Sequence, residues 1–139
     1  MLWGGLAVAD HHEHEKKLPP GPIHDRHELM EGIGRRAKKI GAAAKAGDKK
    51  AMVPEAEAIA AAAKKAPALF PPGSTHPESR AKPEIWKDWA KFEADMTTMQ
   101  KAATNLATVA AADGDTGTAT KQLFEACKAC HDQFRVPED

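Results

Sequence analysis

Two cysteines and a histidine near the C-terminal end have residue types and a spacing suited to a defined chemistry. Their segment, Cys127-Lys128-Ala129-Cys130-His131, has the C-x-x-C-H pattern that is typical of covalent haem c attachment. On a helix this spacing places both sulfur atoms on one side, where each can form a thioether with a vinyl group of the same porphyrin. His131 follows Cys127 by one turn and can ligate the iron. The chain contains two cysteines, and the pattern uses both.

A redox-active dithiol and a zinc site are alternative interpretations of the same residues. A reactive dithiol needs its cysteine at a helix N-terminus, where the helix dipole lowers the thiol pKa, whereas these cysteines lie near the end of a predicted helix. Zinc would need a fourth ligand besides Cys127, Cys130 and His131, and the obvious supply is a His-rich leader. Its imidazoles, those of His11, His12 and His14, could also bind a transition metal loosely. These arguments favour haem c over both alternatives.

The elements that must position this motif are helices, because apolar residues recur at alternating spacings of three and four in four segments. The first predicted helix begins just after Pro22, is weakened at Gly41 and ends at Gly47. The other three run from about residue 52 to Phe70, from Pro83 to about residue 110, and over the segment that stops before Pro137. Pro54 is expected in the first turn of the second helix, where a missing N–H has no cost. The predicted interior positions of the first helix are Ile23, Arg26, Met30, Ile33, Ala37, Ile40 and Ala44. With no strand pattern and two short links, the sequence predicts an all-α antiparallel four-helix bundle.

Composition limits the partners and indicates a cofactor in the core. Twenty basic and twenty acidic residues leave no net charge, so the basic footprint of a nucleic-acid binder is missing. No apolar run reaches the length of about 20 residues that a transmembrane helix needs. About a fifth of the 139 residues are Ala, and large apolar side chains are few. We therefore expect one domain, residues 22–139, whose core is filled in part by a haem.

Residues 1–21 are predicted to be a leader arm. Ala7-Val8-Ala9 has the small-x-small form of a signal-peptidase site, so residues 1–9 are interpreted as the remnant of an export signal. A short disordered arm is the alternative, and both remain open. The polar, Pro-rich remainder of the leader is expected to be solvated.

The chain resembles the class II c-type cytochromes, which include cytochrome c prime and the low-spin cytochrome c556 type, and it is nearer to the c556 type. The resemblance covers about residues 22–136. It rests on residues 127–135, on Pro83-Glu84-Ile85-Trp86, on Arg26-His27-Glu28-Leu29-Met30 and on Phe70-Pro71-Pro72-Gly73-Ser74. It implies a periplasmic four-helix bundle with one covalent haem c held between the helices near one end.

The same resemblance implies roles for four further residues. In the c556 type, Met at the position of Met30 is the sixth iron ligand; an apolar residue such as Leu there leaves a five-coordinate iron that binds nitric oxide or carbon monoxide. Arg26 would bind a haem propionate, Arg135 would shield the open side of His131, and Trp86 would lie in the haem surroundings. The alternatives are that Met30 only packs, that Arg26 reaches water past the bundle end, that Arg135 stabilises the helix C-terminus, and that Trp86 packs on other helices.

The resulting prediction is a periplasmic monohaem cytochrome that carries single electrons, with His131 and Met30 as axial ligands and other proteins as redox partners. The alternative is a five-coordinate protein, like cytochrome c prime, that binds nitric oxide or carbon monoxide. Enzymatic turnover is not expected, because the sequence has no Ser nucleophile motif, no paired carboxylates and no Gly-rich phosphate loop. A homodimer through the outer faces is compatible with the bundle.

Overall fold

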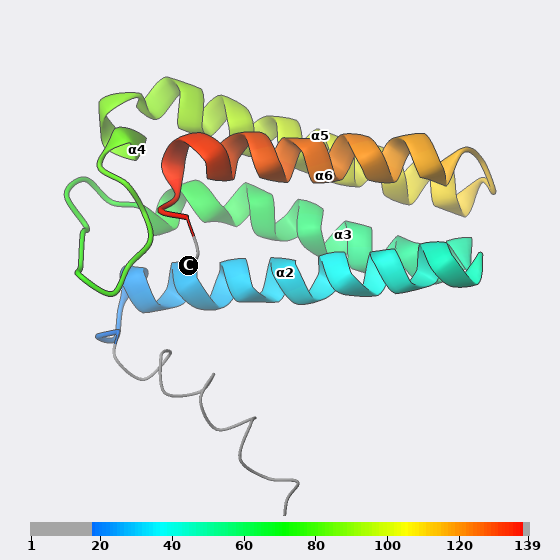
Figure 1. Cartoon of the computed structure of the whole chain (residues 1–139), viewed down its shortest axis with the longest axis horizontal. Helices are drawn as coiled ribbons and strands as arrows, with labels where there is room; N and C mark the ends of the chain where they lie inside the picture. The colour runs from blue at the N-terminus through cyan, green and yellow to red at the C-terminus, as the bar shows by residue number, and fades with distance from the viewer. Residues whose placement is uncertain (1–17, 138–139) are drawn as a thin grey trace, which may run out of the picture.

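Four long helices form an antiparallel bundle (Figure 1). The computed structural model describes residues 18–137, and in this part the long helices are α2 (Pro22–Ala46), α3 (Lys49–Lys65), α5 (Trp89–Ala111) and α6 (Thr116–Phe134). A 3-10 turn, η1 (Ala66–Leu69), extends α3, and a short helix, α4 (Glu84–Lys87), precedes α5. The strand-like pairing within residues 18–137 is a single bridge between Ala81 and Arg135. The predicted four-helix bundle is confirmed.

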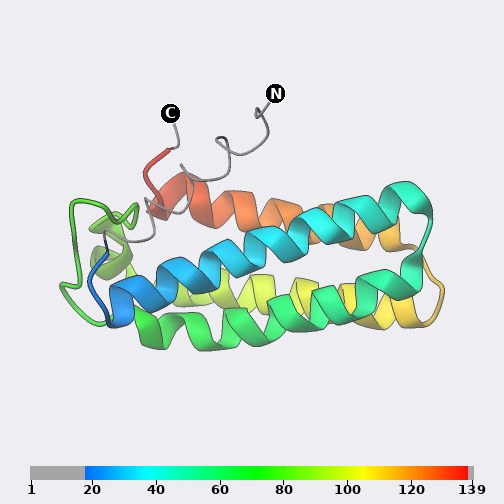
Figure 2. The same ribbon diagram turned by 90° about the horizontal axis from the view of Figure 1, so that it is seen from below.

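Capping residues set the helix ends at the two short turns. Gly47 has a left-handed backbone with φ of 69°, and its N–H donates to the carbonyl of Ala44 at the end of α2. The side chains of Asp48 and Asp115 accept hydrogen bonds from backbone N–H groups in the first turns of α3 and α6. Both turns lie at one end of the bundle, and the connection of residues 70–83 covers the opposite end (Figure 2).

Three local predictions are wrong. Pro54 lies inside α3 rather than in its first turn, because the Asp48 cap starts the helix at Lys49. The third helix is broken at Asp88, whose φ of −129° and ψ of 55° are not helical, and the break separates α4 from α5. Ile85 before the break and Phe92 after it are nonetheless both buried in the core. Near the end of α2, Ala43 is buried, and Ala44, which the pattern predicts as an interior residue, is exposed.

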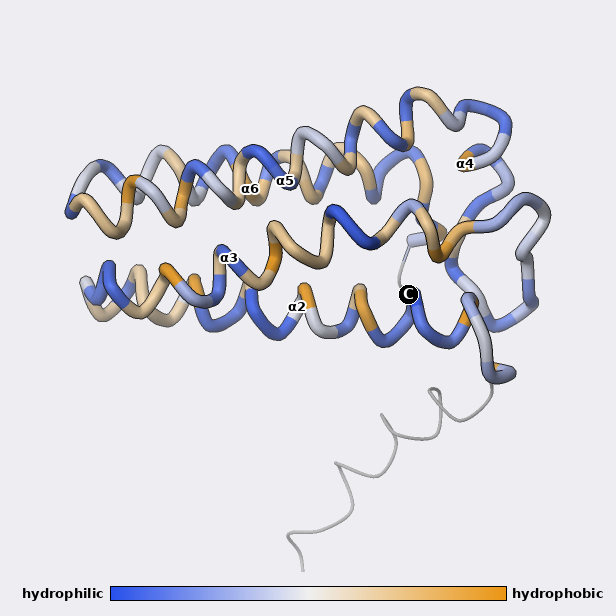
Figure 3. The backbone as a smooth tube through the Cα atoms, turned by 180° about the vertical axis from the view of Figure 1, so that it is seen from behind, coloured by the Kyte–Doolittle hydropathy of each residue, from blue (hydrophilic) through white to orange (hydrophobic). Residues whose placement is uncertain are grey.

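The core is tight on three sides of the bundle and open on the fourth. Helix α3 packs most extensively against α5. The pairs α2–α3 and α5–α6 pack over smaller areas, and α2 and α6 touch at few points. Apolar and polar segments alternate along each helix (Figure 3). The largest fully buried side chains are those of Phe92, Ile40, Met52, Ile59, Ile85, Leu106 and Leu123. The weak contact between α2 and α6 leaves space next to the C-x-x-C-H segment.

Within residues 18–137, none of the helices is both long and apolar enough to cross a membrane. The predictions for the export-signal remnant at residues 1–9 and for His11, His12 and His14 lie outside the described residues. Leu18 belongs to the predicted solvated leader, but it is buried. The last part of the leader is therefore not all solvated, because this Leu removes its apolar surface from water.

Candidate haem site

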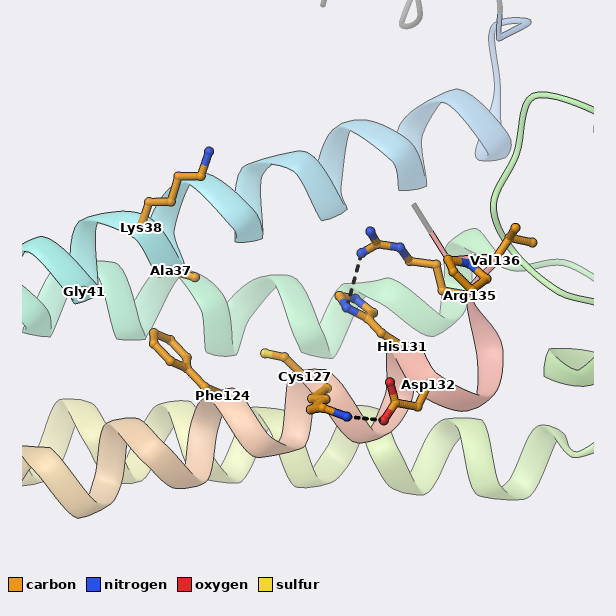
Figure 4. A pocket seen from close by; sticks show the side chains of 11 residues that line it. Ala37, Lys38, Gly41, Phe124, Cys127, His131, Asp132, Arg135 and Val136 are labelled. Atoms are coloured by element: carbon orange, nitrogen blue, oxygen red, sulfur yellow. Dashed lines mark hydrogen bonds and ion pairs between the residues drawn. The ribbon is translucent and has the colours of Figure 1, made fainter. Parts of the chain in front are cut away.

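A cavity of about 730 Å³ opens between α2 and α6, where these helices make few contacts. Its walls are formed by Ala37, Lys38 and Gly41 of α2 and by Phe124, Cys127, Lys128, His131, Asp132, Arg135, Val136 and Pro137 of α6 and the following tail. Phe124 and Cys127 extend from α6 toward Ala37 (Figure 4). The volume falls within the range of about 300–1,000 Å³ that cofactor and ligand pockets have.

Small residues on α2 create this space. Ala37 and Gly41 are one turn apart on the same helix face, opposite Phe124 and Cys127. A Cβ atom added at Gly41 would meet no other atom within 4 Å. Among residues 18–137, the large apolar side chains that remain exposed are those of Phe124 and Val136, and both line the cavity. An apolar group bound here would therefore cover apolar surface that water now contacts.

The two thiols are both free, and they lie in different surroundings. Cys127 is half-buried in the cavity wall, and its Sγ is 3.7 Å from Sδ of Met99 on α5. Cys130 is buried and is absent from the cavity wall. Burial raises the pKa of both thiols, and that of Cys130 reaches about 12, with a smaller contribution from the negative charge of Asp95. Both groups are therefore protonated near neutral pH.

The raised thiol pKa values argue against one of the two alternatives to haem c. A redox dithiol needs a reactive thiolate, and the pKa of its thiol is lowered rather than raised. No cluster of three or more His, Cys, Asp or Glu side chains able to hold a metal ion occurs within residues 18–137. The chemistry of the donor set therefore fits thioether attachment better than direct metal binding.

His131 and Arg135 are brought together at the cavity, one turn apart near the end of α6. An Nη atom of Arg135 lies 3.2 Å from Nδ1 of His131 (Figure 4). Because a guanidinium only donates, Nδ1 is the acceptor in this arrangement. Lys128 and Asp132 form an ion pair of 2.7 Å at the exposed edge of the cavity. The contact expected between Arg135 and His131 is thus present, and its effect on an iron ligand stays a prediction.

Arg26 does not line the cavity and is held by the connection that follows η1. The residue is only 3% exposed, and its guanidinium donates to Oγ and to the carbonyl of Ser74, at 2.6 and 2.5 Å. Longer bonds of 3.3 Å reach the carbonyl of Leu69 and Oγ of Ser79. Arg26 therefore does not reach past the bundle end to water. Its predicted contact with a propionate stays a prediction.

Trp86 and Met30 also lie outside the cavity wall. The indole N–H of Trp86 donates to the carbonyl of Phe70 at 3.0 Å, and its ring lies 5.8 Å from Cζ of Arg26. Met30 is partly buried and packs against the core from α2. The predicted roles of both residues toward the haem stay predictions.

Comparison with known proteins decides the family. A sequence model of the family described as Cytochrome C' matches residues 21–135. This chain belongs to the cytochrome c' family. A cytochrome c' from Rhodopseudomonas palustris is 34% identical over 140 residues, which cover 98% of this chain and 90% of that protein.

Solved structures of cytochromes c' share the bundle. Cytochrome c prime from Shewanella frigidimarina superimposes with a TM-score of 0.77 and 27% identity, covering 84% of this chain and 94% of that one. A nitric oxide complex of a cytochrome c prime variant from Alcaligenes xylosoxidans has a TM-score of 0.69 and 25% identity, covering 85% and 98%. The matched family and the similar proteins are all of the c' type, so the closer resemblance to the c556 type, which depended on one position, Met30, is not supported.

Cytochrome c' proteins bind one covalent haem c with iron. The cavity fits this group in part: Cys127 and His131 supply a thiol and an imidazole from its wall, and the surface of the wall is largely apolar. The second thiol, that of Cys130, is on the same helix but is buried outside the wall. Lys38 and Arg135 place positive charge at the cavity, where it would favour the propionate groups of a haem.

Eight residues of the cavity wall were not identified from the sequence as site residues: Ala37, Lys38, Gly41, Phe124, Lys128, Asp132, Val136 and Pro137. From the sequence, Gly41 is expected only to weaken the first helix, whereas α2 continues through it to Ala46. Its position one turn after Ala37 was the available signal, because two small residues on one face leave room for a bulky group.

Proposed function

We propose that this cytochrome c' binds a diatomic gas, nitric oxide or carbon monoxide, at a single haem c held by Cys127, Cys130 and His131. The observation that carries the proposal is the match to the cytochrome c' family over residues 21–135. One structural neighbour is a nitric oxide complex of such a protein. The absence of Met30 from the wall shared by Cys127 and His131 supports the same choice within the described residues.

The chain's own residues bind and orient the group. Cys127 and Cys130 would hold the haem on α6 through thioether bonds, and His131 would supply an imidazole nitrogen to the iron. Arg135 contacts Nδ1 of His131 and restricts the rotation of the imidazole ring. Phe124, Ala37 and Gly41 form an apolar wall that limits access of water. When bound, the haem supplies an iron with one coordination position open to a gas.

The test is the spectrum of the holoprotein with and without carbon monoxide. We expect a high-spin ferrous spectrum that changes to that of a carbon monoxide complex when the gas is added. A low-spin spectrum that carbon monoxide does not alter would contradict the proposal.

A low-spin electron carrier with His131 and Met30 as ligands is the second candidate, because Met30 packs against the core although it lies outside the cavity wall. Met30 lies one turn after the buried Arg26 and packs against the core. Replacing Met30 with Leu and with Ala separates the candidates. If Met30 ligates the iron, both variants become high-spin and gain carbon monoxide binding. For the gas binder, we expect the Met30→Leu spectrum to match that of the parent.

We also propose that the protein is exported to the periplasm and acts there by binding and electron exchange with redox proteins rather than by catalysis. The support is the export-signal pattern of residues 1–9 and the family membership. Recovery of the mature protein from the periplasmic fraction, with its N-terminus read by mass spectrometry, tests the location. Light scattering of that protein tests the homodimer. Recovery of the protein from the cytoplasm alone would contradict export.

A further inference from the structure

Asp95 of α5 is a buried acidic residue that the proposed function does not use. The residue is 9% exposed, and its Oδ1 accepts a hydrogen bond of 2.5 Å from Nζ of Lys91, one turn earlier on the same helix. Its Oδ2 is buried and has no hydrogen-bond partner among the described residues. Buried carboxylate oxygens without partners are uncommon because their desolvation is not compensated, so this one calls for an explanation.

The packing of α5 against α6 places Asp95 beside the second cysteine of the motif. Met99 contacts Cys127 at 3.7 Å between sulfur atoms. Asp95 precedes Met99 by one helical turn, and Cys130 follows Cys127 by nearly one turn on the antiparallel helix. The register of the two helices therefore brings Asp95 and Cys130 to the same level, and both are buried. The negative charge of Asp95 also contributes to the raised pKa of Cys130, in agreement with this register.

Lys91 balances the negative charge of Asp95 on one side of the carboxylate only. Lys91 pairs with Oδ1 and is half-exposed, so water screens its charge, whereas Oδ2 is buried. A buried charge acts more strongly on its surroundings than an exposed one at the same distance, because the local dielectric is lower. The side of the pair nearer the interior is thus negative.

We propose that Asp95 is an electrostatic determinant of the haem site and that its buried negative charge lowers the reduction potential of the haem attached through Cys130. Lys91 weakens this effect by pairing with Asp95. The inference rests on the proposed haem attachment. Reduction adds one electron to the ferric group, and a nearby carboxylate opposes the added negative charge.

The experiment is a spectroelectrochemical titration of the holoprotein and three variants at neutral pH. Asp95→Asn keeps the shape of the side chain and removes the charge. We expect it to shift the ferric–ferrous equilibrium toward ferrous by about tenfold, which corresponds to about 59 mV for one electron. Lys91→Gln leaves Asp95 uncompensated and is expected to shift the potential in the opposite direction. Glu93→Gln removes an exposed acidic residue from the same helix and serves as the matched control, with no shift expected.

Opposite shifts in Asp95→Asn and Lys91→Gln, with Glu93→Gln unchanged, would support the proposal. Unchanged potentials, or shifts in the same direction in both variants, would overturn it. An ion pair with a purely structural role would not shift the reduction potential in opposite directions when its acidic and its basic member are replaced. If Asp95→Asn fails to fold, Lys91→Gln still tests the proposal, because the side chain of Lys91 is half-exposed and its replacement is compatible with folding. The potential is defined for a gas binder and for an electron carrier alike. If the potentials do not shift as expected, the carbon monoxide experiment still tests the proposed function. If the carbon monoxide experiment fails, the potentials still test the role of Asp95.

Discussion

Arg26 ties α2 to the connection that follows η1, so replacing it with Met should loosen that end of the bundle. Its two bonds to Ser74 are short, and those to Leu69 and Ser79 are at the long limit. A hydrogen bond from a charged group contributes about 1.5–3 kcal/mol, so the two short bonds contribute roughly 3–6 kcal/mol. Burial lowers the pKa of Arg26 by desolvation, which shows that holding this charge in the interior has an opposing cost.

Met fills similar space, avoids this desolvation cost and leaves the Ser74 carbonyl without its partner. We therefore expect a net loss of about 2–3 kcal/mol for Arg26→Met. At roughly 4 °C per kcal/mol for a chain of this size, the melting temperature falls by about 10 °C. Thermal unfolding of the holoprotein by far-UV circular dichroism measures this, with Arg35→Met, an exposed site on the same helix, as the control. Equal melting temperatures for the two variants would refute the reasoning.

Three further predictions concern the core, a cap and the cavity. Phe92 is fully buried, and its ring lies 4.8 Å from that of Phe70 and 5.4 Å from that of Phe134. Phe92→Ala should therefore lower the free energy of unfolding, measured in urea, by about 3–5 kcal/mol. A decrease below about 1 kcal/mol would show that the ring cluster contributes little to stability. Asp115→Ala removes the α6 cap and should lower the melting temperature at neutral pH. Because hydrogen bonds from Thr118 hold the pKa of Asp115 below its usual value, the deficit is fully present above about pH 4 and disappears as the pH falls through the folded-state pKa; a deficit that persists in acid would contradict the cap. Gly41→Leu fills the space between α2 and α6 and should reduce the haem content measured by pyridine haemochrome, whereas full occupancy would place the haem elsewhere.

The helices were predictable because apolar residues recur at helical spacing within each segment, so that one face of each helix can be buried. In the segment predicted as the second helix, the apolar residues that recur at spacings of three and four are all buried: Met52, Ala56, Ile59, Ala63, Ala66 and Phe70. The break at Asp88 was not predictable, since the apolar pattern continues through it. One contact that fixes the chain just before α4 is a hydrogen bond of 2.9 Å from the N–H of Lys82 to the carbonyl of Phe134, residues far apart in sequence.

The site was predictable where a single helix carries it. Cys127, His131 and Arg135 lie on or directly after α6 at spacings that helix geometry fixes, and all three line the cavity. Lys38 and Gly41 enter the wall only because α2 approaches α6 loosely, a feature of tertiary packing. The sequence also could not show that Ser74 supplies hydrogen-bond acceptors for Arg26. A charged residue at a buried helix position indicates that a partner is needed, but the sequence does not identify that partner.

The central claim is that Cys127 and Cys130 hold one haem c by thioether bonds. Intact-mass analysis of the purified holoprotein, combined with a pyridine haemochrome spectrum, tests it most directly. We predict the mass of the polypeptide plus one haem, a spectrum typical of two thioether links, and no reaction of either cysteine with an alkylating reagent. A haem that acidified organic solvent extracts, leaving two alkylable thiols, would contradict the claim.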